Sequence, residues 1–232
     1  MIESKKLHKT YVSGAGPLPV LKGVDLEIAD GEFVSITGPS GAGKSTLLHL
    51  LAGLDTPTKG EVRWDGQPLS KMSDRERARA RNRSMGFVFQ FYHLVSELTA
   101  LENVMLPALI GGSHRRQVRD RAQDCLAQVG LRDRAHHKPR QLSGGELQRV
   151  AIARAIIHEP KVIFCDEPTG NLDSKTGASI TDLLIELNRR QHASIVLVTH
   201  DQALAQVANR RLVMQDGVIV DDAVASERGR RK

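Results

Sequence analysis

The chain has 232 residues, 40% hydrophobic and 26% charged, which is enough for one large or two small globular domains with a proper core. No apolar run of roughly eighteen residues occurs and the start lacks the apolar segment of a secretory signal, so neither a transmembrane helix nor a signal peptide is predicted. The net charge of +6 leaves nucleic acid or an anionic membrane surface open as partners.

The two cysteines, Cys125 and Cys165, have no metal-like spacing. Two cysteines also cannot make the disulfide framework of a small secreted protein, so a cytosolic compartment is the default expectation. Cys165 lies within an apolar run and is most simply a core residue.

The first residues, 2–28, are predicted to form strands broken by the loop Ser13–Pro17. Val24–Ile28 alternates apolar and charged residues, as a half-exposed antiparallel strand does. Asp30-Gly31 predicts a hairpin turn into the next strand, at residues 32–37, which is rich in apolar and β-branched residues and is therefore expected to be buried.

A glycine-rich segment follows this strand and precedes a helix that is expected to stop near Gly53. It consists of Gly38, Pro39, Ser40, Gly41, Ala42, Gly43, Lys44, Ser45 and Thr46. Strand, glycine-rich loop and helix form the context in which G-x-x-x-x-G-K-[ST] binds phosphate, because backbone N–H groups approach the oxygens closely and the helix start favours an anion. We expect Lys44 to reach the β- and γ-phosphates and the Ser45 hydroxyl to ligate Mg²⁺.

A basic helix is predicted from Met72 to Arg83, with Ser73 and Glu76 as a capping box. Its alternating arginines most simply form a solvated surface, although contact with lipid head groups or another anionic partner stays open. The strand at residues 86–90 then ends on the polar Gln90.

The region from Thr99 to Gly130 has helical periodicity, with Thr99 and Glu102 as a second capping-box pair and a break at Gly111-Gly112. This part of the chain is mostly helical, unlike its flanks. It is therefore interpreted as a helical subdomain inserted into an α/β core.

Another helix is expected to open at Leu142–Arg149 and to run to about Ile157. Its serine and two glycines form a potential anion site, although such a turn also simply caps helices. The buried parallel-type strand Val162–Cys165 then leads to Asp166 and Glu167. Because α/β sheets bind ligands at the carboxyl ends of strands, and adjacent carboxylates need stabilisation, we expect Asp166 to hold Mg²⁺ through its waters and Glu167 to polarise an attacking water.

The last elements expected are a helix at Ser179–Arg190, a buried strand at Ser194–Val198 and a hairpin around Gln215–Gly217. Two single residues have both a functional and a structural interpretation. Tyr11 either stacks on an adenine ring or is a strand-end tyrosine, and the residue alone does not decide between them. His200 follows a buried strand, where a histidine is more often structural but is also placed to donate to a γ-phosphate.

In this order and spacing, the motifs resemble the nucleotide-binding subunit of ATP-binding cassette (ABC) systems, over nearly the whole chain from Tyr11 to about Asp221. The resemblance implies an α/β fold, with a P-loop NTPase (RecA-like) core, an antiparallel β subdomain and an inserted α-helical subdomain. It predicts a single ATPase domain at residues 1–222, with the core at about 1–90 and 160–222, the helical subdomain at about 91–159, and a basic, disordered tail at 223–232.

The resemblance also implies a role for each matching residue. The catalytic residues would be Lys44, Gln90, His200 and Glu167, the last as general base. ATP would be bound by Tyr11, stacked on adenine, and by Gly38, Pro39, Ser40, Gly41, Ala42, Gly43, Lys44, Ser45 and Thr46. The opposite protomer would contribute Ser143, Gly144, Gly145 and Asp173, and the metal ligands would be Ser45, Gln90 and Asp166. These roles imply ATP and Mg²⁺, with two ATP molecules held in a head-to-tail homodimer.

Within the family, Phe91–Val104 and Pro107–Gly111 are similar to the branch of lipoprotein-releasing, macrolide-export and cell-division subunits, and most to the lipoprotein-releasing members. This implies a peripheral subunit at the cytoplasmic face of a bacterial inner membrane, driving separate permease subunits that dock at about Phe91–Gly111. Glu146-Leu147 stands at the positions where many members of the family have two glutamines. Both kinds of sequence occur in active members.

Three alternatives stay open. The first is an ATPase of macrolide-export or cell-division type, and the second a non-catalytic structural partner in a cell-division complex. The third, a soluble nucleic-acid-associated ABC ATPase, is suggested only by the net charge. Such members usually carry coiled-coil or zinc-bearing insertions, and this sequence has no heptad run or cysteine cluster, so nucleic acid is disfavoured as a partner.

Overall fold

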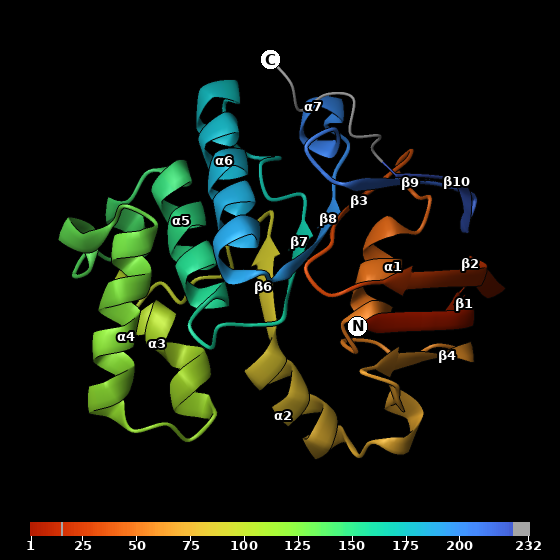
Figure 1. The fold of residues 1–232 in the computed structure, drawn as a ribbon, viewed down its shortest axis with the longest axis horizontal. Coiled ribbons are helices and arrows are strands. Elements are labelled where there is room, and N and C mark those ends of the chain that lie inside the picture. The colour runs from red at the N-terminus through yellow and green to blue at the C-terminus, as the bar shows by residue number, and fades with distance from the viewer. Residues whose placement is uncertain (15, 225–232) are drawn as a thin grey trace. The chain divides into compact units, whose positions relative to one another are not determined.

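The computed structural model describes residues 1–14 and 16–224 (Figure 1). They form two compact units, one made of residues 1–73 together with those from 194 onward, the other of residues 74–193. Most of the tail predicted at 223–232 lies outside the described residues, since the last strand ends at Val224.

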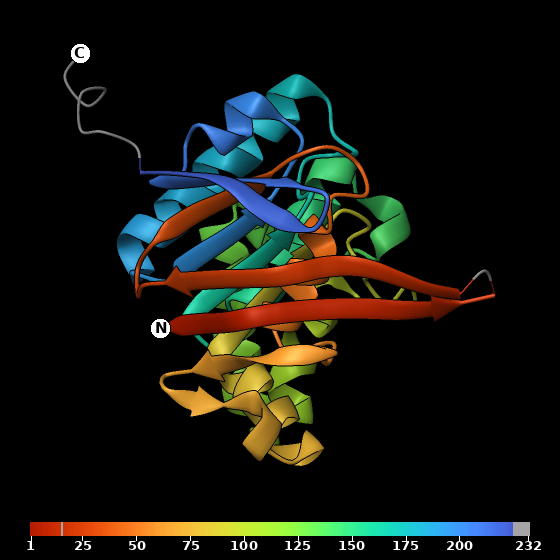
Figure 2. The ribbon, with the colours of Figure 1, turned by 90° about the vertical axis from the view of Figure 1, so that its right-hand side faces the viewer.

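An antiparallel sheet makes up one part of the first unit, with the strand order β2-β1-β4-β5. Its strands are β1 (Ile2–Ser13), β2 (Gly16–Ile28), β4 (Lys59–Trp64) and β5 (Gln67–Pro68). Figure 2 shows β1 and β2 as a long ribbon beside β4. Val24, Leu26 and Ile28 are buried while Asp25 and Glu27 are exposed, which confirms the predicted alternation.

The same unit contains three parallel strands with β3 in the middle. They are β3 (Phe33–Thr37), β8 (Ser194–Val198) and β9 (Arg210–Gln215), and β10 (Val218–Val224) pairs antiparallel with β9 as the predicted hairpin. All residues of β3 and β8 are buried, because these strands are covered on both faces. The unit's helices are α1 (Lys44–Leu51), the 3₁₀ turn Leu69–Lys71 and α7 (Gln202–Ala205).

The hairpin predicted at Asp30-Gly31 is wrong. The chain does turn sharply there, with Gly31 at φ 75° and the Glu32 N–H donating to the Ala29 carbonyl oxygen. However, β2 pairs with β1, whereas β3 pairs with β8 and β9. The turn therefore carries the chain from one sheet to another, where the wholly buried β3 lies between two parallel neighbours.

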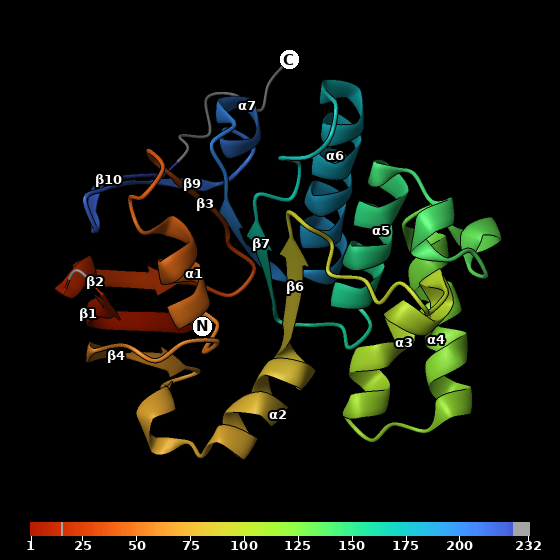
Figure 3. The same ribbon diagram turned by 180° about the vertical axis from the view of Figure 1, so that it is seen from behind.

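The second unit combines two parallel strands, β6 (Met85–Phe89) and β7 (Val162–Asp166), with five helices of its described residues. The helices are α2 (Asp74–Ser84), α3 (Ala100–Ile110), α4 (Arg115–Gln128), α5 (Gly144–Ala155) and α6 (Ser174–Gln191), with 3₁₀ turns at Arg132–Arg134 and Pro139–Gln141. Figures 1 and 3 show α3, α4 and α5 side by side. The mixed α/β composition of the two units confirms the predicted fold class.

Local signals explain most helix limits in this unit. Thr99 and Glu102 form the predicted capping box of α3, and α2 begins directly after Ser73 and buries none of its side chains. The helix predicted from Ser179 in fact begins at Ser174, because the Asp173 carboxylate accepts from the Thr176 N–H and caps an earlier turn.

Both cysteines are free and buried, and burial raises the pKa of the Cys125 thiol to about 11 and also raises that of Cys165. Neither thiol is therefore a reactive group at neutral pH. Within residues 1–14 and 16–224, no helix is both long and apolar enough to cross a membrane.

Candidate functional site

The glycine-rich loop between β3 and α1 has a backbone that only glycine adopts without strain. Gly38, Gly41 and Gly43 have φ values of 141°, 81° and 97°. A Cβ on Gly38 would lie 2.1 Å from the carbonyl oxygen of Met214, and one on Gly43 would lie 2.8 Å from a methyl group of Leu21. Gly41 has open space around it, so its glycine is required by the backbone conformation and not by packing.

Lys44 begins α1 and turns back over this loop. Its ammonium group donates to the carbonyl oxygens of Gly38 and Pro39, each at 2.9 Å. A cation held by the loop, left-handed glycines and the start of an eight-residue helix all favour an anion at the same place. The residues present therefore fit a bound phosphate.

Tyr11 lies at the surface of the same unit, in contact with Asp55 and Lys9, which were not singled out from the sequence. Its hydroxyl donates to Asp55 at 2.9 Å, and it also has a hydrogen bond with Thr46, the last residue of the predicted loop. Burial and the Asp55 carboxylate raise the pKa of the Tyr11 hydroxyl. Lys9 lies 4.8 Å from the centre of the ring and 2.6 Å from Asp55. Through Thr46 and Asp55, the Tyr11 side chain is bonded to α1 and to the segment that follows it. No local sequence pattern predicts these contacts.

His200 follows the carboxyl end of β8, the parallel neighbour of the strand β3 that precedes the glycine-rich loop. In the parallel pairing of β3 with β8, Ile36 lies opposite Val198, and the Thr199 N–H donates to the Ile36 carbonyl oxygen at 3.2 Å. His200 is the next residue and is exposed. Tyr11, the loop and His200 thus all belong to the first unit, with Tyr11 bonded to the end of the loop and His200 following the strand beside β3.

The second unit holds the remaining predicted residues, beginning with Gln90 and the two carboxylates. Phe89 lies opposite Asp166 in the parallel pair, so Gln90 and Glu167 follow the same ends of β6 and β7. Gln90 exchanges two hydrogen bonds with Asn171, each 3.1 Å long. Glu167 has a left-handed backbone, φ 49°, and its carbonyl oxygen accepts from the Gly170 N–H. The segment after β7 is therefore hydrogen-bonded to Gln90 through Asn171.

Ser143, Gly144 and Gly145 form the start of α5, next to the start of α6. The Ser143 hydroxyl accepts from the Glu146 N–H at 3.3 Å, and the Glu146 carboxylate accepts from the Ser143 N–H at 2.8 Å. A Cβ on Gly145 would lie 2.4 Å from a methyl group of Thr176, whose N–H and hydroxyl both donate to Asp173. The close packing of α5 on Thr176 requires glycine at position 145. It also places Ser143 and Asp173, the N-caps of α5 and α6, in the same region.

The charged groups of this turn have shifted pKa values. The Ser143 backbone N–H, together with its hydroxyl and Arg134, lowers the pKa of Glu146. The Thr176 hydroxyl and backbone N–H lower that of Asp173. Both carboxylates are therefore negative at neutral pH, and Glu146 is paired with Arg134 at 3.2 Å.

The predicted metal ligands offer a hydroxyl, an amide and a carboxylate oxygen, and oxygen ligands of this kind suit a hard cation such as Mg²⁺. Among the described residues no cluster of three or more His, Cys, Asp or Glu side chains is arranged to hold a metal. Ser45 lies in the first unit, whereas Gln90 and Asp166 lie in the second. Mg²⁺ usually keeps several waters and binds through one or two carboxylates and substrate phosphates, so each group is of a kind that this ion accepts.

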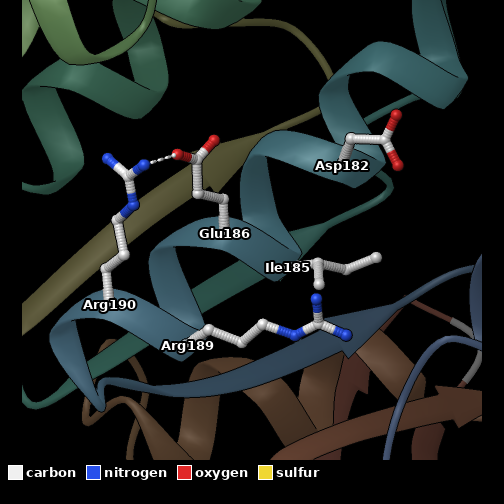
Figure 4. Close-up of a pocket in the computed structure, with 5 residues that line it drawn as sticks. All are labelled: Asp182, Ile185, Glu186, Arg189 and Arg190. Atoms are coloured by element: carbon white, nitrogen blue, oxygen red, sulfur yellow. Dashed lines mark ion pairs between the residues drawn. The ribbon is translucent and has the colours of Figure 1, made fainter. Parts of the chain in front are cut away.

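A surface hollow of about 480 Å³ lies along α6 in the second unit (Figure 4). Its lining residues are Asp182, Ile185, Glu186, Arg189 and Arg190. Arg190 and Glu186, one turn apart on α6, form an ion pair at 2.8 Å (Figure 4). It contains none of the predicted site residues, which lie instead at strand ends and helix starts.

The sequence profile of the ABC transporter family (ABC_tran) matches residues 21–170. The lipoprotein-releasing system ATP-binding protein LolD of Legionella pneumophila (strain Paris) is 50% identical over 217 residues, which cover 94% of this chain and 96% of that protein. Among solved structures, the dimeric bacterial ABC transporter cassette MJ0796 superposes with a TM-score of 0.89 at 45% identity, covering 97% of this chain and 98% of that one.

A second solved structure of the MJ0796 cassette is a dimeric post-hydrolysis state bound to ADP and Pi. It matches with a TM-score of 0.89 at 44% identity over 97% of this chain and 98% of that one. The family profile ends at residue 170, whereas both superpositions continue through nearly the whole chain.

Proposed function

This chain belongs to the ABC transporter family, as an ATPase subunit most like the lipoprotein-releasing members, and from that premise we propose that it powers the release of lipoproteins from a bacterial inner membrane. The observation that carries the proposal is the 50% identity to a lipoprotein-releasing ATP-binding protein over almost the full length of both chains. Every residue that the family's ATP chemistry needs is also present in this chain. We further propose that residues 1–222 work as one ATPase domain, with the helical subdomain at about 91–159.

The proposed reaction is in-line attack of water on the γ-phosphorus of ATP. The new P–O bond forms as the bond to the β–γ bridging oxygen breaks, giving ADP and phosphate. Lys44 and the loop N–H groups hold the β- and γ-phosphates, Glu167 takes a proton from the water, and His200 donates a hydrogen bond to the γ-phosphate. Ser45, Gln90 and Asp166 would hold Mg²⁺, which when bound neutralises phosphate charge.

We propose that two copies assemble head to tail around two ATP molecules. Tyr11 and the loop Gly38–Thr46 of one copy hold the nucleotide, and Ser143–Gly145 and Asp173 of the other copy close over its terminal phosphate. The dimeric state of the solved MJ0796 cassette supports this arrangement. ATP then favours the closed dimer because it makes contacts there that an open dimer lacks.

The proposed partner is a separate permease, bound at the cytoplasmic face of the inner membrane. Phe91, Val95 and Ile110 belong to the segment Phe91–Gly111 and are exposed large hydrophobic residues, with Phe91 68% and Ile110 78% accessible. We propose that a partner covers these three side chains, since contiguous exposed apolar surface marks protein interaction sites. A cytoplasmic helix of the permease is the proposed occupant.

Glu167→Gln tests the chemistry. It should keep ATP binding, trap an ATP-bound dimer and reduce hydrolysis by at least about 100-fold, since general-base catalysis contributes about that factor or more. A variant that still hydrolyses ATP at the normal rate would remove Glu167 from the proposed role.

The transport assignment needs the native complex. Tagged protein purified from membranes should carry an inner-membrane permease, and the reconstituted complex should release a lipoprotein only when ATP is hydrolysed. Release that is equally fast with the Glu167→Gln variant would contradict the proposal. A complex that exports a different cargo would point to the macrolide-export or cell-division type.

A further inference from the structure

The hairpin of β9 and β10 packs directly against the glycine-rich loop, although the two lie near opposite ends of the sequence. A Cβ on Gly38, at the start of the loop, would lie 2.1 Å from the Met214 carbonyl oxygen of β9. At the hairpin turn, the Gly217 N–H donates to the Ala42 carbonyl oxygen at 3.2 Å. The hairpin therefore contacts the loop at both its beginning and its end.

Strand β2 contacts both the hairpin turn and the loop. The Lys22 N–H donates to the Gly217 carbonyl oxygen at 2.9 Å. A Cβ on Gly217 would lie 2.3 Å from the Val20 carbonyl oxygen, and one on Gly43 would lie 3.1 Å from the same oxygen. Gly217 also has a left-handed backbone, φ 85°, so both its conformation and its surroundings require glycine.

The hydrogen bond from Gly217 fixes the direction of a donor in the loop. The peptide bond between Ala42 and Gly43 is planar and trans, so its C=O and N–H groups point in opposite directions. Because the Ala42 carbonyl oxygen accepts from the hairpin, the Gly43 N–H is directed away from the hairpin. Gly43 is the N-cap of α1 and directly precedes Lys44, so this N–H lies at the start of the helix beside the lysine.

We propose that Gly217 is a positioning residue for nucleotide, which holds the Ala42 carbonyl oxygen and thereby aims the Gly43 N–H at the β-phosphate. This inference rests on the proposed function, because it needs a phosphate in the loop. Gly217 acts through the loop and does not touch the reacting atoms. The sequence alone predicts only a hairpin turn at this position.

A glycine-rich loop needs such support from outside. Glycine backbones lose more conformational freedom on ordering than any other residue type, so a contact that orders the loop beforehand lowers the cost of binding. Lys44 orders the beginning of the loop through the carbonyl oxygens of Gly38 and Pro39. It gives up these bonds when its ammonium group turns to the phosphates, whereas the bond from Gly217 remains.

The test compares two alanine substitutions in the full-length chain. Gly217→Ala forces the hairpin turn away from β2 and so shifts its bond to the loop. Gly60→Ala is the matched control, since Gly60 in β4 has a φ of 83° and its Cβ would lie 2.2 Å from the Lys6 carbonyl oxygen. Both substitutions strain a left-handed backbone and meet a carbonyl oxygen about equally closely, but Gly60 packs against β1 and not against the loop.

The dissociation constants for ATP and ADP are measured by calorimetry on the isolated subunit, at a temperature where circular dichroism shows each variant folded. Gly217→Ala should raise both constants by about tenfold, because one hydrogen bond to a charged phosphate is misdirected. The factor should be the same for the two nucleotides, since both contain the β-phosphate. Gly60→Ala should leave both constants unchanged.

A second variant keeps the test decisive if Gly217→Ala does not fold. An ester in place of the amide bond between Asp216 and Gly217, introduced by semisynthesis, replaces the Gly217 N–H with an oxygen that cannot donate and adds no side chain. It should also weaken ATP and ADP binding by about tenfold.

Unchanged affinities in whichever of these two variants folds would overturn the inference. Equal losses in Gly217→Ala and Gly60→Ala would overturn it too, because the effect would then be a general weakening of the unit. A loss for ATP without a loss for ADP would place the effect at the γ-phosphate and contradict a role for the loop. Absence of ATP binding to the unmodified chain would instead contradict the proposed function.

Discussion

Two glycine-bearing turns at helix starts, one in each unit, differ in what their glycines do. Before α1, Gly38, Gly41 and Gly43 have left-handed backbones, and α1 is N-capped by Gly43, which has no side chain to satisfy its first N–H groups. Before α5, Ser143 caps the helix with its own hydroxyl, and Gly145 is required because Thr176 leaves no space for a Cβ.

The difference matches the two kinds of phosphate contact proposed above. The first turn offers backbone N–H groups and a lysine, so it fits a ligand that it binds by itself. The second turn already uses the Ser143 hydroxyl and the N–H groups of Ser143 and Glu146 in a capping box, and it places a carboxylate beside that hydroxyl. It therefore fits a ligand held mainly by another surface, as expected if nucleotide is shared between two copies.

The largest predicted effect is that of Lys44→Ala on the first turn. Losing the ammonium removes charge-assisted hydrogen bonds to phosphate, worth about 3 kcal/mol in total, so ATP affinity should fall about 100-fold. Equilibrium binding of a fluorescent ATP analogue measures it, with the exposed Lys71→Ala as the control. Unchanged affinity would count against the phosphate-binding assignment.

Ser143→Ala should have a smaller effect, and on a different quantity. ATP binding to the isolated subunit should not change, whereas ATP-driven dimerisation in a Glu167→Gln background should weaken about tenfold, since one charge-assisted hydrogen bond is lost. Analytical ultracentrifugation with and without ATP measures the dimer. The lost cap also destabilises α5 by about 1 kcal/mol, so Thr99→Ala, which removes the equivalent cap of α3, is the matched control.

Glu146→Gln should have the smallest effect. The glutamine preserves the reciprocal cap and removes a negative charge beside Ser143, so ATP-driven dimerisation should strengthen by up to about threefold, as surface charges contribute less than 1 kcal/mol. A weaker dimer would show that the carboxylate itself is needed.

The same substitution has a pH signature. Because the Ser143 N–H lowers the pKa of Glu146, this carboxylate stabilises the folded state above its ordinary pKa, and the contribution is lost as the pH falls through the lowered value. In acid unfolding, the free energy of unfolding of the wild type should fall as Glu146 becomes protonated. The Glu146→Gln variant should lack this part of the fall. Identical acid curves would contradict the assigned contact.

The sequence predicted those elements whose formation depends on neighbouring residues alone. The loop Gly38–Thr46, the cap at Thr99 and the buried strand at Val162–Cys165 each follow from a few neighbouring residues. The Asp30-Gly31 turn was assigned to a hairpin because a turn signal does not specify which sheet the next strand joins. The early start of α6 was missed because Asp173 was interpreted as a ligand contact and not as an N-cap.

Contacts between distant residues had no sequence signal. Lys9 and Asp55 are 46 positions apart and meet only because β1 and the segment after α1 lie together. Arg154 reaches the Tyr92 carbonyl oxygen over 62 positions, and nothing in its own surroundings in the sequence distinguishes it from Arg149. The residues proposed to touch nucleotide were identifiable from motifs, whereas these long-range contacts were not.

The central claim is that each nucleotide is held by two copies, and mixing two damaged variants tests it most directly. Lys44→Ala and Ser143→Ala chains, both carrying Glu167→Gln, are combined, and the ATP trapped per dimer is counted. A mixed dimer has one site with an intact loop from one copy and an intact serine from the other, so trapping should rise above that of either variant alone, to one ATP per mixed dimer. If the mixture traps no more ATP than the separate variants, each copy binds its nucleotide alone and the claim is contradicted.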